Sequence, residues 1–166
     1  LVGSSRFYQD KGDQGAFAAV RQHFVRVYEA VKQYNGAVVK TIGDAAMVSY
    51  SNPRDAIESA FEMQKRFSAE DGLRLRISMH RGSCLAVNLN SNIDYFGNTV
   101  NLAAKLQALA EAGQVAFSQT VADDPEVTHW LESKGVTPTR MSYTQPWNGQ
   151  QVPVLRFTVK SKSAAQ

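Results

Sequence analysis

The sequence has only one cysteine, Cys84, so the chain cannot form an internal disulfide. Because free thiols persist in reducing compartments, we expect this protein to work in the cytoplasm. The chain also lacks a signal-peptide pattern and any apolar run near the roughly 20 residues that a membrane-spanning helix requires. A membrane tether elsewhere in a longer protein is compatible with these features.

The sequence likewise lacks a run of lysine and arginine. Its 18 basic and 15 acidic residues are spread along the chain and give a formal net charge of +3. Since nucleic-acid-binding domains cluster basic residues on one face or helix, we expect no nucleic-acid partner. The 166 residues, 43% of them hydrophobic, suit one globular domain with a full core.

Hydrophobic periodicity predicts alternating helices and strands. Spacings of three and four residues mark amphipathic helices, alternation marks half-buried strands, and Gly or Pro marks the boundaries. The first helix is expected to point these side chains inward: Phe17, Val20, Phe24, Val27, Tyr28 and Val31. The predicted elements are, in order, helix 13–34, strands 37–42 and 45–50, helix 53–67, strand 73–80 with a continuation over 82–89 after a bend, helix 98–112, strand 115–118, short helices 118–123 and 125–133, and strands 136–143 and 152–159.

With one strand before Leu1, this order becomes β-α-β-β-α-β plus additions. We therefore expect an α+β fold with a ferredoxin-like (βαββαβ) core, in which helices cover one face of a mostly antiparallel sheet and extra strands follow at the C-terminal end. One domain is expected over residues 1–160, followed by a polar tail over residues 161–166.

Three segments carry residues suited to phosphate chemistry. Val39-Lys40-Thr41-Ile42-Gly43-Asp44 puts a carboxylate at the turn between two strands. Ile93-Asp94-Tyr95-Phe96-Gly97-Asn98-Thr99-Val100-Asn101-Leu102-Ala103-Ala104-Lys105 leads into a helix on which Asn101 and Lys105 share a face. Seen singly, these side chains have ordinary interpretations as turn, edge-strand and solvated helix residues. Together with Leu1-Val2-Gly3-Ser4-Ser5, the segments resemble the class III nucleotidyl cyclases.

The resemblance implies a metal and phosphate site. Asp44 would be one of two metal aspartates, and the cofactor would be Mg²⁺ or Mn²⁺, two ions per active site. The other aspartate would directly precede Leu1, whose backbone carbonyl we also assign to the metal. Gly3, Ser4 and Ser5 would form a loop that binds the outer phosphates through backbone N–H groups and the Ser5 hydroxyl.

The resemblance also implies roles for two further pairs. Lys40 and Asp94 would read the purine, and a lysine donor with an aspartate acceptor complements N1 and N6 of adenine, which favours ATP. Asn101 would orient the ribose. The family has an arginine four residues later, whereas this chain has Lys105, which could stabilise charge on the α-phosphate as a point cation.

The leading hypothesis is an adenylyl cyclase that converts ATP to 3′,5′-cyclic AMP and pyrophosphate. The ribose 3′-oxygen would attack with the assistance of two metal ions at a homodimer interface, and an upstream regulatory or sensor domain is expected. One alternative is a degenerate cyclase homology domain that binds nucleotide or a partner and acts in regulation. Another is a cyclase that makes a different cyclic nucleotide.

Two late features stay open in the sequence. Family members place a basic residue near the C-terminal end against the outer phosphates. Arg140, Arg156 and Lys160 lie in that region, but the residues around them do not match the usual motif. His80 has no second ligand in view, so we interpret it as structural.

Overall fold

The computed structural model describes residues 1–67, 74–89 and 91–159. The predicted tail 161–166 and part of the predicted strand 73–80 lie outside these ranges. The helices are α1 (Ser4–Gln33), α2 (Pro53–Arg66), α3 (Asn98–Leu106) with a 3₁₀ turn at Gln107–Leu109, α4 (Gln119–Ala122) and α5 (Pro125–Ser133). No helix in these ranges has the length and apolar character needed to cross a membrane.

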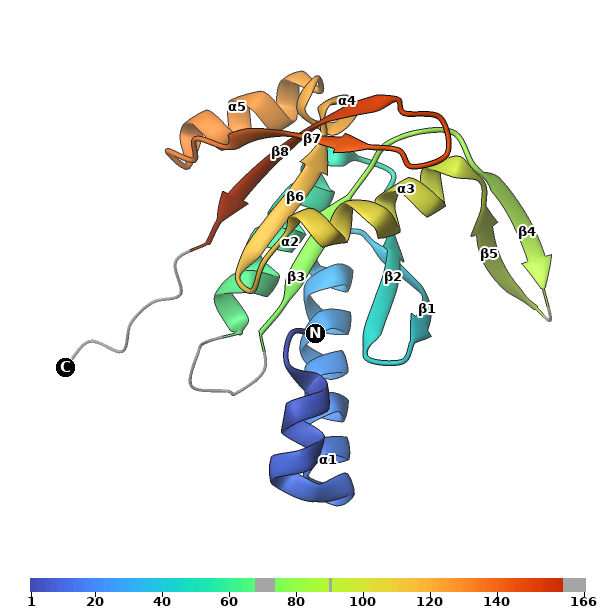
Figure 1. Ribbon diagram of the computed structural model, residues 1–166, viewed down its shortest axis with the longest axis vertical. Helices are drawn as coiled ribbons and strands as arrows, with labels where there is room; N and C mark the ends of the chain where they lie inside the picture. Colours follow the sequence, from blue (N-terminus) through green and yellow to red (C-terminus); the bar gives the residue numbers. More distant parts are fainter. Residues whose placement is uncertain (68–73, 90, 160–166) are drawn as a thin grey trace.

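A four-stranded sheet forms the centre of the molecule, and two hairpins extend from it (Figure 1). In the central sheet β3 and β6 are parallel, whereas β6–β8 and β8–β7 are antiparallel. The hairpins β1–β2 and β4–β5 are antiparallel sheets of their own. The strands are β1 (Ala37–Ile42), β2 (Ala45–Ser49), β3 (Arg76–Met79), β4 (Leu85–Leu89), β5 (Asn92–Phe96), β6 (Gln114–Ser118), β7 (Thr139–Thr144) and β8 (Gln151–Thr158).

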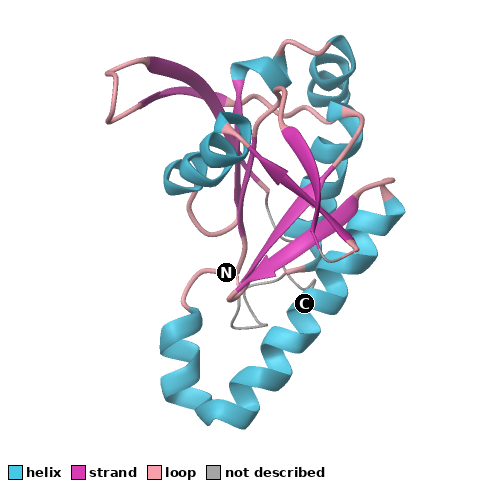
Figure 2. Ribbon diagram, turned by 90° about the vertical axis from the view of Figure 1, so that its right-hand side faces the viewer, coloured by secondary structure: helices cyan, strands magenta, loops and turns pink. Residues whose placement is uncertain are grey.

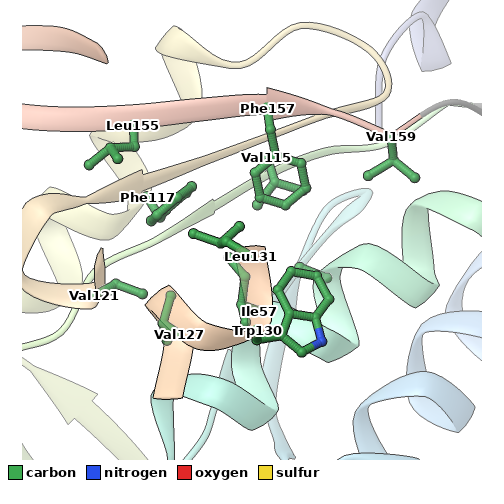
Figure 3. Close-up of a cluster of buried hydrophobic side chains, with 11 residues drawn as sticks. Ile57, Val115, Phe117, Val121, Val127, Trp130, Leu131, Leu155, Phe157 and Val159 are labelled. Carbon is green, nitrogen blue, oxygen red and sulfur yellow. The ribbon is translucent and has the colours of Figure 1, made fainter. Parts of the chain in front are cut away.

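The central sheet has helices on both faces. Val115 and Phe117 of β6 pack in a buried cluster with α2, α4 and α5 (Figure 3). Ala116 lies between them in sequence and packs with Leu106 of α3 in a separate cluster. Since successive strand residues point to opposite faces, α3 covers the second face. As predicted, α2, α4 and α5 cover one face of the sheet. The sequence did not predict that α3 covers the other face.

Helix α1 has two limbs. Gly12 has φ 68° and ψ 170°, which are not helical. The chain reverses direction there, so the two limbs form a V (Figure 2). The second limb is the predicted helix 13–34. The predicted loop at Ser4 and Ser5 is wrong, because both residues belong to α1 and follow Gly3 directly. Gly3 has φ 81°, a left-handed conformation that glycine adopts at little cost, and this lets the chain enter the helix at once.

The buried stripe of α1 is narrower than the sequence pattern. It consists of Ala16, His23, Val27, Ala30 and Val31. Two predicted inward residues are wrong, because Phe17 is 67% exposed and Tyr28 is 49% exposed. The helix packs mainly against α2 and β1, and these cover only one side of it.

The β4–β5 hairpin projects from the body of the molecule (Figure 1). The sequence predicts β4 within the strand continuation over 82–89, but it does not predict β5, on which Asp94 lies. All five residues of β4 are exposed, and the two partly buried residues of β5, Asp94 and Tyr95, are neighbours in sequence. Neither strand therefore has the alternating burial that marks a half-buried strand. The two strands are held by pairing with each other, from Leu85 opposite Phe96 to Leu89 opposite Asn92.

Candidate functional site

Lys40 of β1 and Asp94 of β5 form an ion pair, although they are 54 positions apart in sequence. The Lys40 Nζ donates to Asp94 Oδ2 at 2.6 Å. A register shift between Val38 and Lys40 interrupts the β1–β2 pairing just before the lysine. Bulges of this kind bend a strand and redirect its side chains. The structure therefore brings together the two residues that were predicted to read the base.

The Asp94 carboxylate is held at both oxygens. Lys40 donates to Oδ2, and the backbone N–H of Tyr95 donates to Oδ1 at 2.8 Å. The hydrogen bond from Lys40 is the main cause that lowers the pKa of Asp94 below its usual value. The Lys40 ammonium also lies 5.7 Å from the centre of the Phe96 ring. Asp94, in the middle of β5, is thus an ionised acceptor, and Lys40 of the neighbouring strand β1 is its donor.

Asp44 occupies the second position of a two-residue turn between β1 and β2. Ile42 pairs with Ala45 across this turn, and Gly43 takes φ 59°, which suits glycine in a tight hairpin. The backbone nitrogen of Leu1 lies 3.7 Å from Asp44 Oδ2. The structure therefore places the start of the chain beside this carboxylate, as the assignment of both residues to one metal site requires.

His23 of α1 also reaches this turn, and sequence reasoning missed it. It is 4% exposed and lies close enough to Asp44 for the backbone and carboxylate of that residue to influence the pKa of the ring. Burial is the main cause that lowers the pKa of His23 to about 4, and the Asp44 carboxylate opposes it. A neutral imidazole thus supports the turn. The only signal in the sequence was its place on the buried stripe of the first helix.

The oxygen donors near Asp44 suit a divalent cation for which the protein supplies only some of the ligands. Carboxylate and carbonyl oxygens are the ligands that Mg²⁺ and Mn²⁺ prefer. Within the described ranges, no group of three or more His, Cys, Asp or Glu side chains could hold a metal. Asp44 and the Leu1 carbonyl therefore suit an ion that takes its remaining ligands from phosphates and water, as Mg²⁺ commonly does.

The first turn of α1 lies next to Leu1 in the chain. The backbone N–H groups at a helix start have no acceptor within the helix, and together with the helix dipole they attract anions. Gly3 caps this end without a side-chain hydrogen bond. The predicted phosphate contacts of Gly3, Ser4 and Ser5 would therefore come from a helix N-terminus and not from a free loop.

Asn101 and Lys105 lie on exposed positions of α3, which follows β5 through Gly97. Because β1 contacts β5 and β5 contacts α3, the Lys40–Asp94 pair and this helix belong to one contiguous part of the structure. The Lys105 ammonium lies 3.6 Å from the centre of the Trp147 ring, in the loop between β7 and β8. The sequence did not indicate this contact.

The late basic residues have other partners. Arg156 donates to the Leu109 carbonyl at 3.0 Å, and Arg140 donates to Gln119 Oε1 at 3.4 Å. Lys160 lies outside the described residues. His80 lies at the end of β3, with its Nδ1 2.7 Å from Ser118 Oγ, and burial lowers its pKa.

The predicted site residues fall into two groups. Asp44, Leu1 and the start of α1 would form a metal and phosphate group, and Lys40, Asp94, Asn101 and Lys105 would form a base and ribose group. In the part of the chain that the structure describes, no hydrogen bond or ion pair joins one group to the other.

Known proteins resemble this chain in sequence and in fold. The family described as the adenylate and guanylate cyclase catalytic domain matches residues 1–134. An uncharacterized protein of Mycobacterium tuberculosis is 37% identical over 98 residues, which cover 58% of this chain and 25% of the relative. An adenylate cyclase of Mycosarcoma maydis is 29% identical over 135 residues, which cover 66% of this chain and 5% of that protein. The chain thus spans a quarter or less of the length of these relatives.

A solved structure of similar fold is an adenylate cyclase from Trypanosoma brucei in its monomeric state. It superimposes with a TM-score of 0.79 at 19% identity, over 93% of this chain and 84% of that one. The likeness confirms the predicted α+β fold with its ferredoxin-like core.

Proposed function

Because the chain belongs to the adenylate and guanylate cyclase catalytic-domain family, we propose that it is an adenylyl cyclase, which converts ATP to 3′,5′-cyclic AMP and pyrophosphate. The observation that carries the choice of ATP is the 2.6 Å ion pair between Lys40 and Asp94. An adenine that separates this pair would accept from the lysine at N1 and donate to the aspartate from N6. Guanine presents a donor at N1 and an acceptor at O6, so it would oppose both groups.

The other residues of this group would act on the sugar and the α-phosphate. The Asn101 amide would hydrogen-bond the ribose and aim its 3′-oxygen at the α-phosphorus. Lys105 would stabilise the negative charge that grows on the α-phosphate oxygens as the new P–O bond forms and the bond to pyrophosphate breaks. Reactions of this kind depend on positioning and on charge stabilisation more than on covalent help from the protein.

The metal and phosphate group would hold the other end of the nucleotide. Asp44 and the Leu1 carbonyl would bind Mg²⁺ or Mn²⁺, with two ions expected per site, and the start of α1 at Gly3, Ser4 and Ser5 would bind the outer phosphates. When bound, the ions would lower the pKa of the ribose 3′-hydroxyl and neutralise phosphate charge. His23 would keep the Asp44 turn in place from within the core.

We propose a homodimer in which each active site takes one group from each subunit. The β4–β5 hairpin supports this, because it exposes large apolar side chains that suit a partner surface. They are Leu85 (70% exposed), Ile93 (59%), Leu89 (47%), Phe96 (43%) and Val87 (37%). Phe96 also lies beside Lys40, so a second copy packed on the hairpin would adjoin the base-reading pair.

The first experiment incubates the full-length protein with ATP, GTP, CTP and UTP separately in Mn²⁺, with product identification by mass spectrometry. Cyclic AMP in excess over the other products is the expected result. A preference for GTP would contradict the assignment of Lys40 and Asp94.

A second candidate function is a non-catalytic domain that binds nucleotide and acts in regulation. The observation that favours it is Lys105, which lacks the bidentate guanidinium of the family's arginine. ATP binding by a well-folded dimer that yields no cyclic product would support this alternative. A Lys105→Arg variant tests whether the lysine limits catalysis, since a tenfold gain in turnover would mean that the lysine raises the barrier by about 1.4 kcal/mol.

A further inference from the structure

Lys105 lies on α3 between the side of the helix that carries Asn101 and the side that faces the β7–β8 loop. At 100° per residue, Asn101 lies to one side of it and Asn98 and Leu102 to the other. The Asn101 side belongs to the ribose group. The other side faces the β7–β8 loop, where Thr99, Leu102 and Trp147 line a pocket of about 270 Å³. The Lys105 side chain can therefore be guided by what this loop presents.

The β7–β8 loop presents an aromatic ring on an ordered frame. Its backbone closes through Gln145 N–H to the Gln150 carbonyl and Gly149 N–H to the Gln145 carbonyl, each at 2.9 Å. The Asn148 side chain accepts from the Gln150 N–H at 3.0 Å. Trp147 lies at the tip, 55% exposed, and its ring contacts the Lys105 ammonium at 3.6 Å from the ring centre.

A lysine needs such support more than an arginine does. Its ammonium sits on a flexible four-carbon stem, whereas a guanidinium is planar and pre-organised for phosphate. A tryptophan face attracts the lysine ammonium electrostatically. It offers no oxygen acceptor that would compete with a phosphate for the N–H donors of the lysine. The loop residues 145–150, Gln-Pro-Trp-Asn-Gly-Gln, contain no basic side chain, so Lys105 is the cation that α3 and this loop share.

We propose that Trp147 is a positioning residue for Lys105. The Trp147 ring holds the Lys105 ammonium on one side and leaves the other N–H groups of that ammonium directed at the α-phosphate. This inference rests on the proposed cyclase function and deepens it. Trp147 itself does not touch the reacting atoms. In this chain the ring face would supply the orientation that the family's arginine obtains from its own planar geometry.

The test is a double-mutant cycle with Trp147→Leu, Trp147→Phe, Lys105→Met and the combination of Trp147→Leu with Lys105→Met. Trp147→Leu should lower kcat about fivefold with little change in KM, because both side chains are exposed and an exposed cation–π contact can carry an effect of about that size. Trp147→Phe keeps an aromatic face and should lose about twofold or less. In the Lys105→Met background, Trp147→Leu should have no further effect.

Two kinetic results would overturn the proposal. A rise in kcat for Trp147→Leu would mean that the ring restrains Lys105 away from the nucleotide. An equal loss with and without Lys105 would mean that Trp147 only shapes the pocket. Circular dichroism spectra like that of the wild type would exclude unfolding as the cause, which is expected because Trp147 is more than half exposed.

A readout independent of turnover separates this inference from the proposed function. In ¹H–¹³C NMR spectra, the ε-methylene signal of Lys105, assigned by its loss in Lys105→Met, should show an upfield ring-current shift that disappears in Trp147→Leu. If the wild type makes no cyclic nucleotide, the proposed function fails, and the same cycle is measured on the affinity for α,β-methylene-ATP. Coupling between the two residues there would retain the positioning role, and its absence would end it.

Discussion

Lys40 and Asp94 are each other's partners, so a change at one leaves the other charge without its complement. We predict that Lys40→Glu lowers kcat/KM for ATP by at least about tenfold, because the adenine N1 acceptor would then meet a carboxylate acceptor. Initial rates of cyclic AMP formation at several ATP concentrations measure the effect.

A matched control exists on α2. Lys65 is 39% exposed, as Lys40 is, and pairs with Glu62 at 3.0 Å, yet it lies outside both functional groups. Lys65→Glu should leave ATP turnover unchanged. Equal activity of the wild type and Lys40→Glu would show that this pair does not read the base.

His80 should make the stability of the fold depend on pH. Burial lowers its folded-state pKa below the unfolded value of 6.5, so between these two values the unfolded chain binds more protons than the folded one. Stability is therefore present above pH 6.5 and decreases as the pH falls toward the folded pKa. Urea unfolding of the wild type and His80→Gln at pH 7.5 and 5.5 tests this.

The variant should lose less stability than the wild type over that interval. The loss of stability of the variant is subtracted from that of the wild type, because His23, whose pKa is lowered to about 4, contributes in the same direction in both proteins. Parallel losses would mean that the contact of His80 with Ser118 persists when the ring is protonated.

At the scale of elements, the sequence predicted those parts whose neighbours are near in the chain. The β1–β2 hairpin turns at Gly43 and Asp44 as expected, and α2 and α5 begin at prolines, where Asn52 and Asp124 cap the first turns. These signals are local, since a cap, a proline and an alternating pattern act within a few residues.

What the sequence missed depends on contacts between distant segments. No local sequence signal shows which face of the sheet α3 covers. Its place there depends on packing against the small Ala116 and on the hydrogen bond from Ser78 Oγ to the Ala103 carbonyl. The same holds for the site. The motifs identified Lys40 and Asp94, whereas His23 and Trp147 act through residues more than 20 and 40 positions away.

The β4–β5 hairpin is the element on which assembly should depend. We predict that Leu85→Asp weakens dimerisation by at least tenfold in Kd, because a carboxylate in an apolar contact must lose its water without gaining a partner. Thermal stability of the monomer should not change, since Leu85 is 70% exposed. Sedimentation velocity over a range of concentrations measures the dissociation constant.

Phe17→Asp is the control for an added charge at an exposed apolar position, because Phe17 on α1 is 67% exposed. It should dimerise like the wild type. If Leu85→Asp does so too, the hairpin is not the contact between subunits.

At the scale of the whole molecule, the separation of the two functional groups predicts complementation between inactive variants. In a two-fold symmetric dimer with shared sites, Asp44→Asn removes the metal carboxylate from both sites, and Asn101→Ala removes the ribose contact from both. Each variant alone should be inactive. A mixed dimer would place both defects in one site and leave the other site intact.

After subunit exchange in an equimolar mixture, half of the dimers are mixed, and each has one working site of two, so about a quarter of the wild-type activity should return. The matched control mixes Asn101→Ala with Lys40→Glu, whose defects lie in the same group. Every site of that mixture lacks one of the two residues, so its activity should not rise above the mean of the two variants measured separately. If the first mixture also stays inactive although differently tagged subunits purify together, each site is built within one subunit. The two groups would then have to approach one another within a single chain, and the shared-site dimer would be wrong.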